Sequence, residues 1–220
     1  MQVHYEFADR QALKARLEST GDTHELDVPR ASPLPHDGDW VAAHFCAGAV
    51  RFTVAARACV NAQAAHLIFE DRDWERLHAL LNLPSFEPAN SPQQPKVLLV
   101  DYDTDTCQVV SALLDQAGYH TAVAHSPETA FELLQRDDWQ LLIVDCQIAG
   151  KGSPGFCRRI RSDGRSGRVP ILFMSVRDEQ EVARDTRAAG ADDFIMKPFR
   201  APELVARAQS LLSVPCGIWR

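Results

Sequence analysis

The sequence predicts an α/β protein in two parts: a C-terminal domain built on a parallel, doubly wound sheet, and before it a small, mainly antiparallel β barrel with a terminal helix. After residue 95, short solid apolar runs alternate with helical patterns, as in parallel strands covered on both faces. Before residue 84, apolar residues alternate with polar or small ones, as in strands with one buried face. A length of 220 residues accommodates two domains.

A proline-rich stretch separates the two patterns. Residues 84–95 contain four prolines, and proline can neither donate to a strand ladder nor continue a helix. This composition favours an extended spacer. We therefore expect a first domain over residues 1–83, a linker over 84–95 and a second domain over 96–213.

The first half reads as short strands with two helices. From Val50 to Val60 every second residue is Val, Phe or Ala, which predicts a strand with one buried face. Residues 10–18 predict a helix instead, because Leu13 and Leu17 share one side. Further strands are expected over residues 3–7, 25–28, 41–46 and 66–69. A closing helix is expected over residues 71–82, from its N-cap Asp71 and the helical spacing of Trp74, Leu77, Leu80 and Leu81.

This half resembles the PilZ-like barrels of bacterial signalling proteins, chiefly in the segment 66–70 followed by 74–77. PilZ domains that bind cyclic di-GMP carry two arginines four residues apart, followed by an acidic or amide residue, a serine and a glycine on the next strand. Here Lys14 stands four residues after Arg10, and residues 20–26 hold no such serine and glycine arrangement. The mismatch disfavours cyclic di-GMP, for which no residue is assigned, and leaves a protein-interaction or structural module as the alternative.

The second half predicts a strand followed by a helix, repeated five times. Helices are expected over 109–116 up to Gly118, over 127–136 with Ser126 as cap and Pro127 in the first turn, and over 179–189 up to Gly190. The expected strands are 97–100, 121–124, 141–144, 171–174 and 194–196. This alternation predicts a parallel sheet with right-handed crossovers, whose functional groups gather at the carboxyl ends of its strands.

Four of these strands are followed at once by a polar residue. The four residues are Asp101, Asp145, Ser175 and Lys197. A carboxylate nucleophile, a second carboxylate for a hard cation, a hydroxyl and an ammonium form a set suited to phosphoryl transfer, which requires positioning and charge neutralisation. One polar strand end is ordinary where a strand meets water, but four of these types in this order favour shared chemistry.

The segments that carry these residues resemble response regulator receiver domains. The matching segments are Lys96–Asp101, Leu142–Asp145, Ile171–Ser175 and Gly190–Phe199, within a resemblance that covers residues 96–212. The resemblance implies a flavodoxin-like fold with strand order 2-1-3-4-5. It also implies a histidine kinase or phosphotransfer protein as phosphodonor.

By the same resemblance, Asp145 accepts the phosphoryl group and Lys197 pairs with the phosphoryl oxygens. Asp101, Asp145 and the backbone carbonyl of Gln147 would hold Mg²⁺. Ser175 would move to bond the new phosphoryl group. Phe194 would rotate inward as the switch aromatic, and the bond before Pro198 would be cis.

Three positions depart from the receiver pattern. Receivers usually have two adjacent acids after the first strand, whereas here Tyr102 stands between Asp101 and Asp103. Two carboxylates can suffice for Mg²⁺ at reduced affinity, and Asp103 is a candidate further ligand. Val176 is bulkier than the usual small residue, which should slow the access of phosphodonors and water. The loop over residues 146–155 is longer than usual and is expected to be flexible.

Composition excludes several classes of protein. The net charge is −7 with basic residues scattered among acids, so DNA binding is disfavoured. The apolar runs are far shorter than the roughly 20 residues of a membrane span, so no membrane insertion is expected. Six cysteines show no zinc-finger spacing, which favours free thiols in a reducing, cytoplasmic setting. Seven of the eight histidines are expected to be ordinary surface or half-buried residues: His4, His36, His44, His66, His78, His120 and His125.

The leading hypothesis is a cytoplasmic signalling protein and not an enzyme. Its receiver, with Asp145 as phosphoacceptor, would modulate protein interactions of the receiver face or of the N-terminal barrel with an unidentified output partner. A cyclic di-GMP sensor and a phosphorylation-independent pseudo-receiver scaffold are the two alternatives. The scaffold predicts that Asp145→Asn and wild type support partner binding equally.

Overall fold

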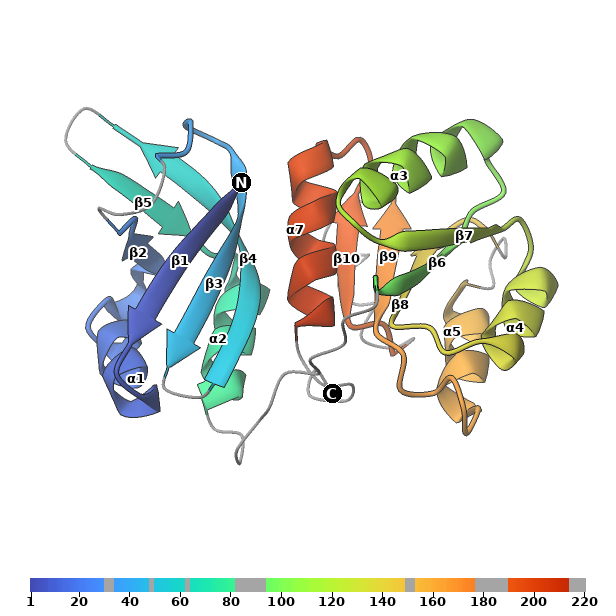
Figure 1. The fold of residues 1–220 in the computed structure, drawn as a ribbon, viewed down its shortest axis with the longest axis horizontal. Coiled ribbons are helices and arrows are strands. Elements are labelled where there is room, and N and C mark those ends of the chain that lie inside the picture. Colours follow the sequence, from blue (N-terminus) through green and yellow to red (C-terminus); the bar gives the residue numbers. More distant parts are fainter. Residues whose placement is uncertain are drawn as a thin grey trace. The chain divides into compact units, whose positions relative to one another are not determined.

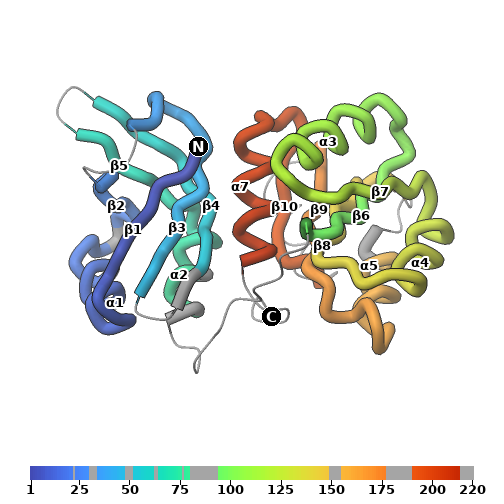
Figure 2. Tube along the Cα trace, viewed as in Figure 1, coloured from blue at the N-terminus to red at the C-terminus, as the bar shows by residue number. Residues whose placement is uncertain are grey.

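The computed structural model describes residues 1–29, 34–47, 50–61, 64–81, 94–148, 153–176 and 190–213. Contacts divide the chain into two compact units, one of residues 1–90 with 202–218 and one of 91–201 with 219–220. Figures 1 and 2 trace the chain through both. This division assigns the last helix to the N-terminal unit, whereas the predicted second domain ran on to residue 213. Most of the predicted linker lies outside the described residues, so its limits stay a prediction.

The N-terminal unit contains a five-stranded sheet and its helices. The elements are β1 (Gln2–Phe7), α1 (Arg10–Glu18), a 3₁₀ turn (Gly21–Thr23), β2 (Glu25–Asp27), β3 (Trp40–Ala47), β4 (Val50–Val60), β5 (Ala65–Ile68), α2 (Asp71–Leu81) and, from the end of the chain, α7 (Ala201–Leu212). The predicted strands and both predicted helices are therefore present, with limits that move by at most one residue.

The strands of this sheet pair in the order β1-β3-β4-β5-β2. Three of the pairings are antiparallel, while β1 runs parallel to β3. The mainly antiparallel prediction is thus right, but the barrel is not confirmed, because in the described ranges β1 and β2 are the two edges and no pairing closes the sheet. A parallel partner for β1 could not be read from local alternation, since pairing joins segments about 40 residues apart.

One face of the sheet carries the aromatic core of the unit. Phe45 of β3 stacks on Tyr5 and on Phe52, with ring centroids 4.9 and 5.3 Å apart. Phe69 lies between Phe45 and Trp74 of α2. In α1, the two leucines at positions 13 and 17 are buried as predicted. Burial of these large apolar groups is the main term that stabilises the unit.

The opposite face is also buried, which the alternation did not predict. Its cluster consists of Trp40, Ala42 and Ala55 with Ala206 of α7. Small side chains on a strand allow close approach of a covering element. The alanines of β3 and β4 were therefore the available sign that a helix covers this face.

The start of α2 differs from the prediction. Asp71 is the first helical residue rather than the N-cap, and the amides of Asp73 and Trp74 donate to the carbonyl of Glu70, both at 2.9 Å. Glu70 therefore occupies the cap position. Its carboxylate is left free to pair with cations.

The second unit contains a parallel sheet. Its elements are β6 (Lys96–Val100), α3 (Thr104–Gln116), β7 (His120–Ala124), α4 (Pro127–Arg136), β8 (Leu141–Asp145), α5 (Ser153–Ser162), β9 (Ile171–Ser175) and β10 (Asp193–Met196). The strand order β10-β9-β8-β6-β7 equals the expected 2-1-3-4-5, and every pairing is parallel. Figure 1 shows α3 on one side of this sheet and α4 and α5 on the other.

Helix ends in this unit follow the local chemistry of the sequence. The hydroxyl of Ser126 accepts from the amide of Thr129 at 3.1 Å, with Pro127 in the first turn of α4, as predicted. Gly118 follows α3 with φ +90°, a conformation that glycine adopts without strain. The expected loop over residues 146–155 is shorter than predicted, because α5 begins at Ser153. The expected helix over residues 179–189 lies outside the described residues.

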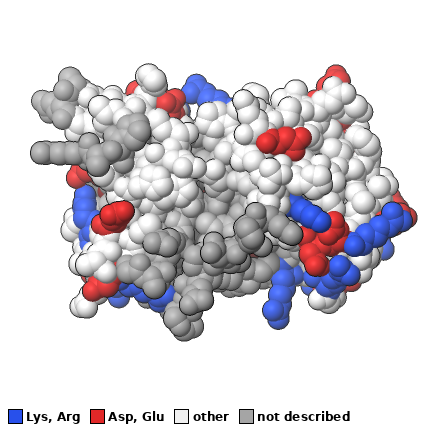
Figure 3. Space-filling model, in the orientation of Figure 1, with Lys and Arg blue, Asp and Glu red and all other residues white. Residues whose placement is uncertain are grey.

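Two further findings concern the molecular surface. None of the helices in the described ranges combines the length and apolar character that a membrane crossing requires. On the face drawn in Figure 3, acidic and basic side chains lie near one another rather than in a continuous basic stripe. All cysteines in the described part of the chain are free thiols; Cys216 lies outside it.

Candidate functional site

The carboxyl edge of the parallel sheet holds the residues that the strand-end pattern singled out. Asp145 and Ser175 are the last residues of β8 and β9, while Asp101 and Lys197 directly follow β6 and β10. Because β6, β8, β9 and β10 are consecutive neighbours, their carboxyl ends lie along one edge.

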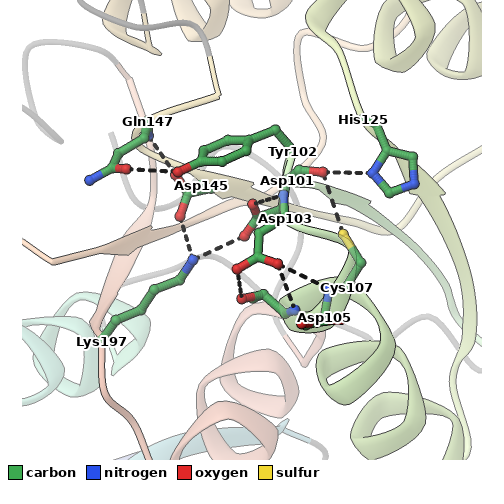
Figure 4. Close-up of polar contacts among 10 residues, drawn as sticks. Asp101, Tyr102, Asp103, Asp105, Cys107, His125, Asp145, Gln147 and Lys197 are labelled. Carbon is green, nitrogen blue, oxygen red and sulfur yellow. Dashed lines mark hydrogen bonds and ion pairs between the residues drawn. The ribbon is translucent and has the colours of Figure 1, made fainter.

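Lys197 links the two carboxylates of this edge. Its Nζ donates to Oδ2 of Asp101 at 2.9 Å and also to Oδ2 of Asp145 (Figure 4). Both acids are buried, with 0% of Asp101 and 5% of Asp145 exposed. Buried carboxylates require a cation or hydrogen bonds to remain charged, and the ammonium supplies both.

The environment keeps Lys197 protonated. Burial by itself would lower its pKa, but hydrogen bonds and charge attraction from Asp145 and then Asp101 outweigh burial and hold the pKa above its ordinary value. In formal charge, two carboxylates and one ammonium leave one negative charge at this edge, which favours a cation.

Gln147 and Tyr102 lie beside Asp145. The amide of Gln147 donates to Oδ1 of Asp145 at 2.6 Å, which fixes the second carboxylate oxygen. The hydroxyl of Tyr102 donates to Oε1 of Gln147 at 3.2 Å, and Figure 4 shows its side chain extending toward that residue. Tyr102 is 58% exposed, so its side chain lies at the solvent-facing side of the site.

Asp103 does not point toward a shared cation with the other acids. Its carboxylate is the N-cap of α3 and accepts from the amides of Asp105 and Thr106 and from the Thr106 hydroxyl. The hydrogen bond from the Thr106 hydroxyl, and then that from the Thr106 amide, lower the pKa of Asp103. The backbone amide of Asp103 donates to Oδ1 of Asp101 at 2.9 Å. Asp103 therefore positions Asp101 through its backbone while its side chain serves the helix.

The candidate ligands for Mg²⁺ at this edge are few and are all oxygen atoms. No described group of three or more His, Cys, Asp or Glu side chains is arranged to hold a metal ion. Two carboxylates, Asp101 and Asp145, lie together at this edge, and the carbonyl of Gln147 stays a predicted further ligand. Mg²⁺ prefers oxygen ligands and commonly keeps several waters around one or two carboxylates, so this set fits the ion chemically.

Ser175 and Phe194 are both buried, with 2% and 5% exposed. Phe194 packs in the core cluster that includes Phe173 and Val144. We expected Phe194 to rotate inward on activation, but its ring is already buried in the core of the unit. The carbonyl of Ser175 accepts from the amide of Lys197 at 2.5 Å, which ties the end of β9 to the residue after β10. Val176, the second departure from the receiver pattern, is 56% exposed.

Two residues near the site were missed. Nδ1 of His125 lies 3.0 Å from the backbone carbonyl of Asp101, and the Cys107 thiol donates to the same carbonyl at 3.4 Å. Burial, followed by the nearby acids, raises the pKa of Cys107 to about 11, so it is a neutral thiol. His125 directly follows β7, so the strand-end rule applied to the weaker strand would have found it. Contact of Cys107 with a backbone carbonyl leaves no signal in the sequence.

The segment before β10 has a structural role. Oδ2 of Asp192 accepts from Nη2 of Arg161 at 2.5 Å and from the amide of Ile171 at 2.8 Å. Arg161 also donates to the carbonyls of Gly190 and Val169. Asp192 thus holds the chain that leads to Lys197 rather than joining the site itself.

Curated relatives match about half of this chain. The phosphate regulon transcriptional regulatory protein PhoB of Rhizobium meliloti (strain 1021) is 30% identical over 118 residues, which are 54% of this chain and 52% of that protein. The transcriptional regulatory protein CpxR of Klebsiella pneumoniae is 32% identical over 117 residues, 53% of this chain and 49% of that protein. The chain thus spans about half the length of these relatives.

Solved structures match the same part of the chain. The chemotaxis response regulator CheY4 of Vibrio cholerae is 26% identical with a TM-score of 0.51, covering 54% of this chain and 99% of that one. A response regulator from Chloroflexus aurantiacus is 28% identical with a TM-score of 0.53, covering 56% and 100%. The receiver domain of a sensor histidine kinase from Pseudomonas aeruginosa, solved with magnesium in its own active-site cleft, is 24% identical with a TM-score of 0.51, covers 55% and 99%, and shares the fold.

The match to a family model coincides with the parallel-sheet region. The model of the response regulator receiver domain covers residues 97–209, more than half of the chain, from β6 into α7. The five-stranded parallel sheet and the solved neighbours agree with this match. No comparison supports the PilZ-like prediction for the N-terminal part. By its sequence and its fold over residues 97–209, the chain belongs to the response regulator receiver domain family.

Proposed function

We propose that this chain is a cytoplasmic two-component signalling protein whose receiver takes a phosphoryl group on Asp145 from a histidine kinase or phosphotransfer protein. The observation that carries the proposal is the pairing of Lys197 with both Asp101 and Asp145 at the carboxyl edge of the sheet. A buried carboxylate beside a fixed ammonium is a nucleophile with a cation ready for the arriving phosphoryl oxygens.

In this reaction an oxygen of Asp145 attacks the phosphorus of a phosphohistidine. The P–N bond breaks, the imidazole leaves, and an acyl phosphate forms on Asp145. Lys197 turns its ammonium to the phosphoryl oxygens, and Ser175 donates its hydroxyl to one of them. Mg²⁺, held by Asp101, Asp145 and the carbonyl of Gln147, would supply neutralising charge. The protein is changed once by this reaction, and we therefore propose a signalling rather than an enzymatic role.

Treatment with a small phosphodonor tests the proposal. Incubation with acetyl phosphate and Mg²⁺, followed by intact mass measurement, is expected to add one phosphoryl group to the wild type. The adduct should be absent in Asp145→Asn, which keeps the shape of the side chain but lacks the nucleophilic carboxylate.

Asp138→Asn is a matched control, because Asp138 is an exposed acid of the same unit whose carboxylate pairs with Arg165. This variant should be phosphorylated like the wild type. No adduct on the wild type, with a family member phosphorylated in parallel, would leave the pseudo-receiver scaffold as the surviving function.

For the output we propose a protein partner. Two curated relatives are transcriptional regulators by name, but this chain spans only about half their length, so DNA binding is not carried over. The cyclic di-GMP alternative has no observation in its favour, since Arg10 and Lys14 are both on α1 and the family comparison does not reach them.

A further inference from the structure

Helix α7 is part of the receiver by its sequence but part of the N-terminal unit by its contacts. By sequence it lies at the end of the receiver match, which covers residues 97–209. By contacts it belongs to the N-terminal unit, together with residues 1–90. The connection from Lys197 to the first residue of α7, Ala201, is only three residues long. A helix of the signalling domain is therefore packed in the N-terminal unit.

The centre of this packing is a fully buried arginine. Arg207 of α7 has 0% of its surface exposed, and its Nη2 lies 3.0 Å from Oε2 of Glu70. Its Nη1 lies 3.4 Å from Asp73, which is also fully buried, and its Nε lies 3.3 Å from Glu203. The guanidinium carbon is 4.6 Å from the centre of the Trp40 ring.

Such an arginine depends on its partners. Burying a guanidinium without a counter-charge costs several kcal/mol, so Arg207 is stable inside only while Glu70 and Asp73 face it. Burying the two carboxylates against a helix that offered no cation would likewise cost free energy. Burial would raise the pKa of Glu70, but the charges of Arg207 and Arg72 outweigh burial and lower it, which keeps the acid ionised. Arg207 on α7 and the acids Glu70 and Asp73 thus depend on one another for their burial.

Two further contacts hold the same helix, and the second of them does not involve Arg207 or its partners. Ala206 packs against Trp40, Ala42 and Ala55, where only small side chains allow close approach. At the end of α7, the amide of Thr53 in β4 donates to Oγ of Ser213 at 2.9 Å.

The Ser213 contact uses an unpaired part of β4. Strand β5 pairs only with residues 57–60 of β4, so in the described strands residues 50–56 have β3 as neighbour on one side alone. The Ser213 hydroxyl lies 3.2 Å from the Thr53 carbonyl and 2.9 Å from that of Ser210, and its single hydrogen can donate to either. The Ser213 hydroxyl thereby bonds to backbone groups of Thr53 that would otherwise be available to a neighbouring strand.

We propose that the N-terminal sheet is the resident intramolecular partner of α7, and that phosphorylation of Asp145 is read out by a loosening of α7 on this sheet. The second clause rests on the proposed function. Phosphorylation redirects Lys197, which only three residues separate from the start of α7. The ion pairs of α7 are complete beforehand, so a displacement lengthens them and weakens the contact.

Hydrogen exchange on the full chain tests the docking. Ser213→Ala and Arg207→Ala should each speed exchange in residues 50–56 and in α7 by about tenfold or more, which corresponds to about 1.4 kcal/mol. The matched control is Arg136→Ala, an exposed arginine of α4 paired with Glu132, which should leave both segments unchanged. Unchanged protection in both test variants would overturn the docking. If Arg207→Ala does not fold, Ser213→Ala decides, because it removes a single hydroxyl.

A second arm tests the coupling. Acetyl phosphate with Mg²⁺ should speed exchange in residues 50–56 of the wild type and not of Asp145→Asn. A phosphoryl adduct with unchanged exchange would overturn the coupling while the proposed function stands. Absence of an adduct would refute the proposed function and the coupling together, and the docking would still be judged by the variants.

Discussion

At the scale of single residues, the site is defined by what surrounds two buried carboxylates. Asp101 and Asp145 share the ammonium of Lys197, and the backbone amides of Asp103 and Gln147 hold one further oxygen of each. Positions of these acids were predictable from the residues that follow solid apolar strands. Backbone amides that fix a carboxylate have no sequence signature, because every residue except proline carries one.

Tyr102 is the residue whose replacement should change the chemistry most. Tyr102→Asp is expected to add a metal ligand beside Asp101 and to lower the Mg²⁺ concentration for half-maximal phosphorylation by about tenfold, or about 1.4 kcal/mol. Acetyl phosphate reactions over a range of Mg²⁺ concentrations, read by intact mass, measure this.

Tyr102→Phe is the control for the hydroxyl. It removes the bond to Gln147 without adding a carboxylate, so its Mg²⁺ dependence should match the wild type. An equal effect of both substitutions would show that the hydroxyl, not the missing ligand, limits the site.

His44 makes the N-terminal unit sensitive to acid. Burial, and then the charge of His4, lower the pKa of His44 to about 4. Unfolded, the side chain binds a proton below about pH 6.5, so between these values the unfolded chain binds more protons than the folded one. Stability should therefore fall as pH drops from about 6.5 to about 4, by on the order of 2 kcal/mol after allowance for partial exposure.

Denaturant unfolding of His44→Gln across this pH range measures the contribution. The amide can keep a hydrogen bond to Thr53, whose hydroxyl lies 2.8 Å from Nδ1 of His44, but it cannot titrate. Its stability should vary less with pH than that of the wild type. His120→Gln, at an exposed position, should keep the wild-type slope; an unchanged slope in His44→Gln would contradict the assignment.

At the scale of elements, the parallel-sheet unit was the more predictable half. Runs such as Leu141–Val144 are long enough and apolar enough to be buried on both faces, so strand number, order and caps followed from the sequence and the family resemblance. The N-terminal sheet was less predictable. Its five strands follow from alternation, but the parallel pairing of β1 with β3 and the cover on the second face depend on segments far away along the chain.

Gly118 should be required at the end of α3. Its φ of +90° strains any residue with a side chain, although nothing lies within 4 Å of an added Cβ. Gly118→Ala should therefore lower the free energy of unfolding by about 1–2 kcal/mol through backbone strain alone.

Gly164→Ala is the matched comparison, because that glycine also has open space around its Cβ position and no left-handed φ. It should be neutral or stabilising by up to about 1 kcal/mol. Denaturant midpoints of the two variants give the answer, and equal midpoints would speak against strain at Gly118.

At the scale of the whole molecule, net charge is the property that the sequence settles best. A charge of −7 repels the phosphate backbone, so duplex DNA should bind more weakly than about 100 µM near physiological salt. Fluorescence anisotropy of a labelled random duplex measures this. Saturable binding that weakens steeply with added salt would contradict the prediction.

The sequence did not predict that α7 packs in the N-terminal unit. The pattern from 201 to 212 reads as the last helix of a receiver, and nothing in its spacing shows that Arg207 is fully buried. An arginine on a helix is normally expected to be exposed to solvent. Besides Glu203, four residues earlier, the acids that stabilise buried Arg207 lie 134 and 137 residues earlier, where no local pattern reveals them.

The Ser213 hydroxyl has a consequence for the behaviour of the protein in a crowded cell. An unpaired strand segment offers a row of amides and carbonyls on which a strand from another chain can grow, and such growth leads to aggregation. Ser213 meets the amide of this segment at Thr53, without presenting a new strand edge of its own. When α7 dissociates from the sheet, residues 50–56 can pair with a strand of another chain. Rebinding of α7 therefore also protects the protein against aggregation.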